Sequence, residues 1–560
     1  MARTSQTEIE RKYAVEGERS LPDLAGVGAA SGVRVESVVT LEPYTLEAVY
    51  FDTAELALAR RRIALRRREG GHDAGWHVKL PAVEGRTELQ WPLDHAADAD
   101  GSAGPAADGV AGSAPHEVPH DVVEAVRVHV RGRSLTPLAQ VLTTRRVTEL
   151  RDGDGRLVAE IADDAVRATD AREGTTRLWH EWEAELGEAA PDTAEGRAAL
   201  LDAIEARLLE AGATVSPSVS KLAQALGRTG LGAEVPSSGD GASTGAGRVD
   251  VTAADPPATA AVRQGLAELV ERLIVLDPAV RDDEADALHR FRTTMRRIRS
   301  ALSIHRALFE ATAVDGLRDS LSRFGAVLGE VRDLEVRAAW AAHALDDLAA
   351  ERGVDDPDAE RRLVEDTRAE HAEAHGRLLR AMGQPVYFGL LDSLEELTGA
   401  GAWADPTASE AALSPKKEAK RALRKAGRRA LARSVPADDL VDAGSADLAE
   451  AAGSAGALHD SRKAARRLRH AAEFSSTGAG AVLGSSARTL SEHAEELQDA
   501  LGLHRDASLF AEFVLLTSRR ADAAGESSFT YGVLYQRSLD QARQALEVAE
   551  AARRALKRTL

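Results

Sequence analysis

Apolar and polar residues alternate with a period of two in several short segments of the first 226 residues. Because successive side chains of a strand point to opposite faces, this alternation predicts antiparallel strands. Residues 94–119 are rich in Ala, Gly, Asp and Pro, which predicts a loop that interrupts the domain without ending it. The alternation is clearest in residues 7–15, 46–52, 63–68, 77–80, 158–162 and 180–186.

From about residue 260 the pattern changes to long segments rich in Ala, Leu, Arg and Glu, with apolar residues at helical spacing. Residues 229–259 are rich in Gly, Ser, Ala and Pro and cannot bury enough apolar surface to order themselves. We therefore predict a multidomain chain with a first domain at 1–228, a flexible linker at 229–259 and an all-α domain at 260–560. The predicted helices include residues 260–274, 285–309, 363–382, 416–433 and 535–556.

The helical half contains an internal repeat with an offset of 170 positions. His289, Arg292, Arg296, Arg297 and Arg299 recur as His459, Arg462, Arg466, Arg467 and Arg469. A second echo follows, since Leu-Gly-x-x-Arg-Asp occurs at residues 328–333 and again at 501–506. These repeats predict two related helical bundles, about 260–400 and 415–560, joined through residues 399–415.

Composition narrows the chemistry. With 560 residues the chain exceeds what one hydrophobic core usually organises. Its net charge of −19 argues against indiscriminate nucleic-acid binding. It has no cysteine, so any metal must be held by oxygen or imidazole, which favours Mg²⁺ or Mn²⁺ over zinc. No run of about 18 apolar residues and no signal peptide is found, which predicts a cytoplasmic protein without a membrane partner.

The predicted strands carry charge on one face. Glu8, Glu10 and Lys12 share a face because side chains alternate. A solvated strand face would explain one such segment, but the pattern recurs from strand to strand, as a barrel with a charged interior requires. The other in-phase sets are Arg66 with Arg68, His77 with Lys79, Arg86 with Glu88, Glu160 with Asp164, and Glu181 with Glu183 and Glu185.

As a set, these residues resemble the CYTH family, also called triphosphate tunnel metalloenzymes, whose hallmark is an amino-terminal E-x-E-x-K strand. The resemblance spans about residues 7–226. It implies an eight-stranded antiparallel β tunnel, an α+β domain, with inward-facing acids and bases. Beyond the first strand it rests on residues 50–53, Arg66, Arg68, Lys79, Arg86, Glu88, Arg145, Arg146, Glu160, Glu183, Glu185, Ser220 and Lys221.

The resemblance also implies roles. A triphosphate needs cations around its oxygens and hard metal ions held by carboxylates. Catalysis is assigned to Glu8, Glu10 and Lys12. The metal, Mg²⁺ or Mn²⁺, is assigned to Glu8, Glu10, Glu183 and Glu185. Binding of the phosphate oxygens is assigned to Lys12, Arg66, Arg68, Lys79, Arg86, Arg145, Arg146 and Lys221.

Three assignments stay open at the sequence level. Arg145 and Arg146 are adjacent, so only one of them can face the interior of an extended strand. Glu181 is in phase with Glu185 and could replace it as an inward carboxylate, or it could form a structural salt bridge. We interpret His77 as a packing or rim residue.

Basic residues form stripes on the predicted helices. His289, Arg292, Arg296 and Arg299 are spaced by three, four and three residues, which places them along one helix face. Salt-bridged solvated faces would explain one such helix, but the same stripe recurs in the second repeat. The recurring residues are His459, Arg462, Arg466 and Arg469.

This repeat resembles the CHAD domain, over about residues 260–560. The resemblance implies binding of inorganic polyphosphate by the two stripes, in a groove that Arg332 and Arg505 could line. Their alternative role is a salt bridge to Asp333, Asp506 or another carboxylate.

Taken together, the patterns favour a metal-dependent inorganic triphosphatase with a polyphosphate-binding domain, and no specific nucleic-acid partner. One alternative is a hydrolase or cyclase of an organic triphosphate, such as thiamine triphosphate or ATP. Another is a non-catalytic protein that binds cytoplasmic polyphosphate granules.

Overall fold

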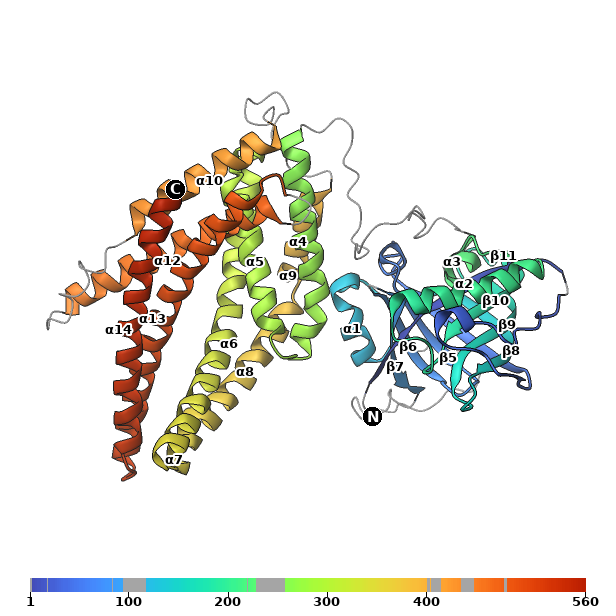
Figure 1. Cartoon of the computed structure of the whole chain (residues 1–560), viewed down its shortest axis with the longest axis horizontal. Coiled ribbons are helices and arrows are strands. Elements are labelled where there is room, and N and C mark those ends of the chain that lie inside the picture. The colour runs from blue at the N-terminus through green and yellow to red at the C-terminus, as the bar shows by residue number, and fades with distance from the viewer. Residues whose placement is uncertain are drawn as a thin grey trace, which may run out of the picture. The chain divides into compact units, whose positions relative to one another are not determined.

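A computed structural model describes residues 3–93 except 18 and 83, 117–227 except 219, 257–399, 403, 414–434, 448–477 and 481–560. The chain forms two compact units, Met1–Gly247 and Arg248–Leu560, a β-rich unit and a helical unit (Figure 1). Most of the predicted linker at 229–259 and most of the predicted loop at 94–119 lie outside the described residues, and linker residues 257–259 are instead the start of helix α4. The predicted connection at 399–415 does so too, apart from a few positions.

The β-rich unit is built on one antiparallel sheet, and every strand predicted from alternation is confirmed. Its strands are β1 (Thr4–Glu8), β2 (Glu10–Val15), β3 (Ser37–Thr40), β4 (Tyr44–Asp52), β5 (Ala64–Glu69), β6 (Gly75–Pro81), β7 (Arg86–Pro92), β8 (Thr136–Arg151), β9 (Leu157–Asp170), β10 (Thr176–Leu186) and β11 (Thr214–Val215). Its helices are η1 (Ala29–Ser31), η2 (Ala59–Arg61), α1 (His120–Val130), α2 (Ala194–Glu210) and α3 (Lys221–Ala225).

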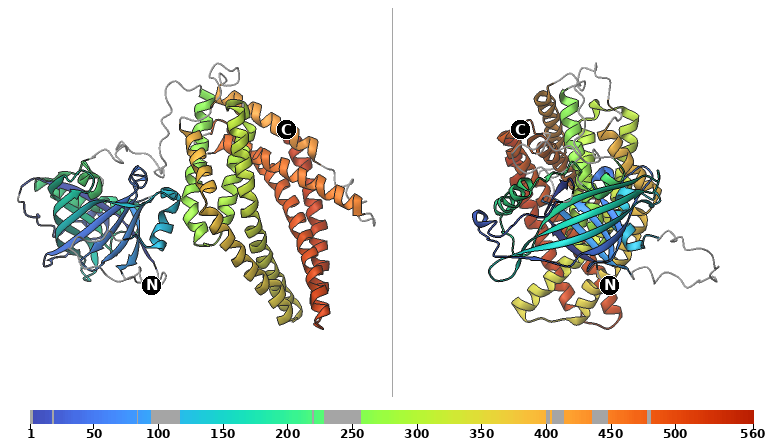
Figure 2. Two further views of the ribbon diagram at one scale, coloured as in Figure 1. Left: turned by 180° about the vertical axis from the view of Figure 1, so that it is seen from behind. Right: turned by 90° about the vertical axis from the view of Figure 1, so that its right-hand side faces the viewer.

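The first strand closes the sheet on itself. β1 pairs with β7, and β2, which follows after a single residue, pairs with β10 at the other end of the series β7-β6-β5-β4-β8-β9-β10. Counted as one interrupted strand, β1 and β2 join β4 to β10 as the eight long strands of the described unit. Two views show the long strands curling around a common interior (Figure 2). The predicted eight-stranded tunnel is confirmed.

The tunnel buries apolar side chains on its outside. In β6, Trp76 and Val78 point outward and pack with Val122 and Val126 of α1. Their neighbours His77 and Lys79 therefore point to the opposite, inner face of the strand. A second outer core joins β2, β8, β9 and β10 to α2. Because the helices cover the apolar outer face, the inner face is free to carry charge.

Asp52 organises the loop after β4. Its buried carboxylate accepts hydrogen bonds from the backbone N–H groups of Thr53 (2.7 Å), Leu58 (2.9 Å) and Ala59 (2.9 Å). The preceding Tyr50 lines the tunnel, whereas Phe51 belongs to the outer core. The segment 50–53 thus contributes one tunnel residue and one loop anchor.

The predicted helices of the second unit are confirmed. They form two consecutive groups, α4 to α9 and α10 to α14 (Figure 1). The first group holds α4 (Pro257–Arg281), α5 (Ala287–Ile304), η4 (Arg306–Leu308), α6 (Ala311–Arg352), α7 (Pro357–Glu360), the π-helix η5 (Arg361–Glu365), α8 (Asp366–Met382) and α9 (Pro385–Thr398). The second holds α10 (Pro415–Arg433), α12 (Leu448–Ser476), α13 (Ser485–Ala523) and α14 (Phe529–Thr559).

Two sets of contacts between described residues illustrate how the two groups meet. Near the ends of α5 and α12, Ser300 Oγ and His470 Nδ1 are hydrogen bonded at 2.9 Å, and these residues are 170 positions apart. Equivalent positions of the two repeats therefore face each other across a local two-fold relation. At the far ends of α6 and α13, Arg362 donates hydrogen bonds to Glu526 above a shared apolar core that includes Phe510 and Leu363.

Candidate functional site

The interior of the tunnel is a cavity of about 330 Å³ lined mainly by charged side chains. The structure brings together every tunnel residue predicted from the sequence except Arg146. Those that line the cavity are Glu8, Glu10, Lys12, Arg66, Arg68, Lys79, Arg86, Arg145, Glu183, Glu185 and Lys221.

The strand register places a row of carboxylates across three neighbouring strands. Glu185 of β10 lies opposite Glu10 of β2 on one side and opposite Glu160 of β9 on the other. Burial, together with the charge of Glu8, raises the pKa of Glu185 to about 8. Burial also raises the pKa of Glu8 and Glu160. Directly opposed like charges are unfavourable, so this acidic row calls for a cation.

The acidic row fits a hard divalent metal ion. Its donors are all carboxylate oxygens, which Mg²⁺ and Mn²⁺ prefer. The Lys12 ammonium also reaches the row, since its Nζ lies 3.0 Å from Glu10 Oε2. Burial alone would raise the pKa of Glu10, but Lys12 and Lys79 lower it to about 2. Glu10 is therefore ionised and available as a ligand across the physiological pH range.

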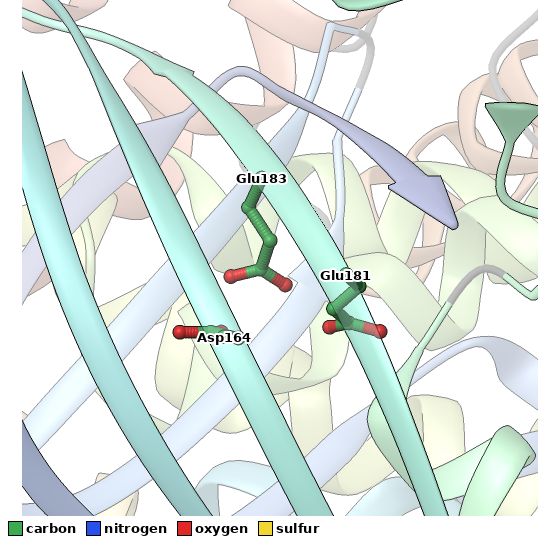
Figure 3. A group of neighbouring side chains, drawn as sticks. All are labelled: Asp164, Glu181 and Glu183. Carbon is green, nitrogen blue, oxygen red and sulfur yellow. The ribbon is translucent and has the colours of Figure 1, made fainter. Parts of the chain in front are cut away.

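A second acidic group lies deeper along the same strands. Asp164 of β9 and Glu181 and Glu183 of β10 point toward one another, with carboxylate oxygens within 4.8 Å (Figure 3). Such a group could hold a metal ion, but the Lys221 ammonium already lies among the three carboxylates. Its Nζ is 2.9 Å from Asp164, 2.6 Å from Glu181 and 2.7 Å from Glu183. A metal ion here would have to displace Lys221, so the acidic row is the better metal candidate.

Lys221 reaches this position because of a local cap. Ser220 is the N-cap of α3, and its side chain accepts a hydrogen bond from the backbone N–H of Ala223 at 3.1 Å. Lys221 is the first residue of the helix and is buried. The cap at Ser220 thus starts a helix whose first residue, Lys221, directs its ammonium into the tunnel.

Cations cover the opposite wall of the cavity. Arg66 Nη2 lies 3.3 Å from Glu88 Oε1, and Lys79 contacts Glu8. Burial, followed by the charge of Arg66, lowers the pKa of Arg68 to about 9. The Nε atoms of Arg66 and Arg68 are buried without a hydrogen-bond acceptor. This wall therefore holds more positive charge and more donors than its own carboxylates satisfy.

The structure resolves the choice between Arg145 and Arg146. Arg145 lies opposite Asp164 in the register and donates to it from Nε (2.8 Å) and Nη2 (2.6 Å). The same Nη2 donates to Glu183 at 2.6 Å. Arg146 is exposed and does not line the cavity, because adjacent residues of a strand point to opposite faces.

Two anchoring residues had not been assigned roles from the sequence. Glu88, which is buried, accepts hydrogen bonds from Gln6 (3.4 Å) and Arg66 (3.3 Å) and lies 3.1 Å from His77 Nδ1. Asp164 anchors Arg145 and Lys221. Both belong to the in-phase charged sets found from the alternation, which places them on the inner face but does not show which cation each one anchors. His77 is fully buried, and burial lowers its pKa to about 4, in line with a packing role.

The helical unit contains a second cavity, of about 660 Å³, between its two groups of helices. Its charged lining is almost entirely basic, with Asp333 and Asp506 as the acidic members. Arg332 and Arg505 line it as expected, although Arg332 also donates to Glu335 at 2.7 Å. The predicted stripe residues in the lining are His289, Arg292, Arg296, Arg299, His459, Arg462 and Arg466.

Arg469 is the one predicted stripe residue that the lining lacks. Its guanidinium donates to Glu473 at 2.8 Å and lies 2.6 Å from Glu495. Helical spacing alone places it on the stripe, but two carboxylates within reach hold it elsewhere. Arg469 therefore lies outside the basic cavity, and its predicted place among the ligand-binding residues is not supported.

The arginines of this cavity crowd one another. Burial and the charge of Arg292 lower the pKa of Arg296 to about 9, and burial and Arg462 lower that of Arg466 to about 10. The Nε atoms of Arg292 and Arg462 are buried without an acceptor. Excess positive charge and unused donors are the features of an anion site.

These features define a class of protein in which a charged antiparallel tunnel precedes a repeated helical domain with a basic cavity. The CYTH domain model matches residues 6–203 and the CHAD domain model matches residues 264–515. The chain belongs to the family of proteins in which a CYTH domain is followed by a CHAD domain. Members of the CYTH family are metal-dependent triphosphatases or cyclases.

Relatives match over nearly the whole length. The chain is 35% identical over 568 residues to uncharacterized proteins from two strains of Mycobacterium tuberculosis, which covers 98% of this chain and 96% of theirs. Among solved structures, PptA from Streptomyces chartreusis is 21% identical, with a TM-score of 0.39, over 54% of this chain and 99% of that one. The CHAD domain from Ricinus communis is 23% identical, with a TM-score of 0.32, over 52% and 93%. Within the described part of the chain, none of the helices has the length and apolarity needed to span a membrane.

Proposed function

We propose that the tunnel hydrolyses inorganic triphosphate with Mg²⁺ or Mn²⁺ and that the helical domain binds inorganic polyphosphate. One observation carries the first part. A carboxylate row suited to a hard metal ion and a wall of under-neutralised cations face each other across one small cavity. A triphosphate bound with its metal ion supplies the missing charges of both sides.

In this proposal, binding exchanges partners inside the tunnel. The phosphate oxygens accept hydrogen bonds from Arg66, Arg68 and Lys79. In the free protein these three cations contact Glu88, Asp73 and Glu8, respectively. Glu8, Glu10 and Glu185 would hold the metal ion, and a bound Mg²⁺ or Mn²⁺ would supply positive charge beside the transferring phosphoryl group. Arg145, held by Asp164, positions a guanidinium beside Glu183 for a phosphate oxygen.

The size and polarity of the cavity favour an inorganic substrate. At about 330 Å³, with charged groups on both walls, the cavity has more polar than apolar lining, which favours phosphate groups over a base or a thiazolium ring. Phosphate release from tripolyphosphate, ATP and thiamine triphosphate, each with Mg²⁺ or Mn²⁺, tests the proposal. We expect tripolyphosphate to be the preferred substrate. Cyclic AMP from ATP, or preference for an organic triphosphate, would reassign the tunnel, and no turnover would leave binding as its role.

Arg66 and Arg67 provide a matched pair of variants. Arg66 lines the tunnel, whereas Arg67 points outward and donates to Glu69 at 2.5 Å. We expect Arg66→Ala to lower kcat/KM for tripolyphosphate about 100-fold, because charge-assisted contacts are strong in a confined site. Arg67→Ala should stay within about twofold of wild type. Equal losses from both variants would contradict an alternating inner face.

Metal affinity should depend on pH through Glu185. A metal ion needs the ionised carboxylate, and the pKa of Glu185 is raised to about 8. Below that pH the metal must displace a proton, so its affinity should rise about tenfold per pH unit between about pH 6 and pH 8 and then level off. Calorimetric titration with Mn²⁺ measures this slope. Glu185→Gln should bind Mn²⁺ more weakly and with a flatter profile, whereas a flat wild-type profile would contradict the assignment.

For the helical domain, the supporting observation is the pairing of two arginine stripes around one cavity. Equivalent cations such as Arg296 and Arg466 face the same space, and neighbouring arginines lower the pKa of both. A linear polyanion satisfies both stripes at once, whereas a single small anion does not. Binding should therefore strengthen with chain length, which titration with orthophosphate, tripolyphosphate and long-chain polyphosphate measures.

A further inference from the structure

The second sequence echo lies on the wall of the basic cavity. Leu-Gly-x-x-Arg-Asp occupies residues 328–333 on α6 and residues 501–506 on α13. In each copy the leucine and the glycine are buried, and the arginine and the aspartate line the cavity. The conserved spacing within the two copies thus places the same four residue types at equivalent positions.

Each glycine lies against an arginine on the neighbouring stripe helix of the same group. A methyl group on Gly502 would lie 3.1 Å from Nη2 of Arg462, and one on Gly329 would lie 3.6 Å from Nη2 of Arg292. The first distance is tighter than an ordinary contact, whereas the second is ordinary. Both guanidiniums therefore lie directly over helix backbone that has no side chain.

In the first copy the aspartate pairs with this guanidinium, since Arg292 Nη1 donates to Asp333 Oδ1 at 3.1 Å. In the second copy Asp506 lines the same cavity as Arg462. Burial raises the pKa of Asp506, and the charge of Arg462 is the largest influence that opposes this rise. The charges that face the two carboxylates come from α5, α6, α12 and α13, and all but the aspartates themselves are basic. Arg292 and Arg462 still keep an Nε without an acceptor.

We propose that the two Leu-Gly-x-x-Arg-Asp segments are arginine cradles, in which the aspartate is an internal counter-ion that an anionic ligand must displace and in which Gly502 leaves the room that Arg462 occupies. This rests on the proposed binding of polyphosphate to the same cavity. Asp333 and Asp506 act through the arginines as positioning residues. They hold the guanidiniums ready in the free protein and at the same time weaken binding by their own charge.

Asparagine separates these two effects, because it keeps an oxygen that can accept from the guanidinium and removes the negative charge. Full-length protein is titrated with fluorescently labelled long-chain polyphosphate in chelator, so that the metal-dependent tunnel does not turn it over. We expect Asp333→Asn combined with Asp506→Asn to bind about fivefold to tenfold more tightly than wild type. The gain should shrink as salt is added.

The control is Asp346→Asn combined with Asp522→Asn, which changes the net charge equally at exposed positions on the same two helices. It should bind like wild type. If wild type fails to bind polyphosphate at low salt, the proposed function itself fails. If wild type binds but the cavity variant binds equally or less tightly, or if the control tightens as much, the cradle is overturned.

The glycines give an independent arm. Gly502→Ala should weaken binding about threefold, because its methyl group displaces the Arg462 guanidinium, whereas Gly329→Ala should not. Alanine is favoured over glycine inside a helix, so the melting temperature of both variants should be kept or raised. A loss of affinity without a loss of stability is not what a merely structural glycine produces. Equal affinities for the two variants would contradict the role of Gly502.

Discussion

Glu10→Gln is expected to lower the turnover of tripolyphosphate at least about 100-fold, because it removes charge from a metal ligand at constant volume. Glu10 is the most firmly ionised member of the acidic row, since Lys12 and Lys79 hold its pKa at about 2. Glu185 and Glu160 have raised pKa values and bind a proton more readily. Loss of Glu10 therefore removes the ligand that is charged at every pH of interest.

The fold should survive this substitution. Lys12, the nearest partner of Glu10, keeps its contact with Glu183. Glu16→Gln makes the same chemical change at an exposed position just beyond β2 and serves as the control. Circular dichroism and phosphate release at limiting Mg²⁺ or Mn²⁺ measure the outcome. Wild-type turnover of Glu10→Gln at low metal concentration would move the metal site away from the acidic row.

The sequence predicts the tunnel well because a barrel with a charged interior imposes a period of two on every strand. Glu8, Glu10 and Lys12 are in phase with each other, and so are Arg66 and Arg68, so one rule places all five in the cavity. Local alternation does not say which phase faces inward when both are charged. Arg145 and Arg146 could be separated only by the register that sets Arg145 opposite Asp164.

Contacts between side chains that lie far apart in the sequence could not be predicted from it. Glu88 anchors Arg66 from 22 positions away, and Lys221 reaches Glu183 from a helix that follows the whole sheet. Such contacts depend on strand register and on where a later helix packs, which no short-range pattern encodes. A long-range contact also explains why Arg469 lies outside the cavity, although its position in the repeat is equivalent to that of Arg299. A carboxylate from another helix, Glu495, removes it from the cavity.

Both cavities share a physical arrangement in which the protein supplies provisional partners for its own binding groups. In the tunnel, Glu8 contacts Lys79, and Glu183 contacts Lys12 and Lys221. In the helical domain, Asp333 occupies Arg292. Buried charges are costly without partners, so such internal pairing lets the free protein fold around a site built for a strongly charged ligand. Only a ligand with high charge density compensates for the free energy that is lost when these ion pairs are broken.

Charge reversal in the basic cavity is expected to give the largest effect on polyphosphate. Replacing Arg292, Arg296, Arg462 and Arg466 together with Glu should weaken binding of long-chain polyphosphate on the order of 1,000-fold or more, because attraction becomes repulsion along both stripes. Hydrolysis of tripolyphosphate should stay unchanged, since the tunnel belongs to the other compact unit. Equilibrium titration at several salt concentrations, beside phosphate release, measures both results.

Stability distinguishes this loss from unfolding. Neighbouring arginines, among them Arg292 and Arg462, lower the pKa of Arg296 and of Arg466, so repulsion among these cations opposes folding. Glutamates among the remaining arginines relieve that repulsion, and we expect the melting temperature to be kept or raised. The control reverses four exposed cations of the same unit, Arg519, Arg520, Lys557 and Arg558, for the same change in net charge. If the control loses polyphosphate as fully as the cavity variant, binding follows overall charge and the paired stripes are not the site.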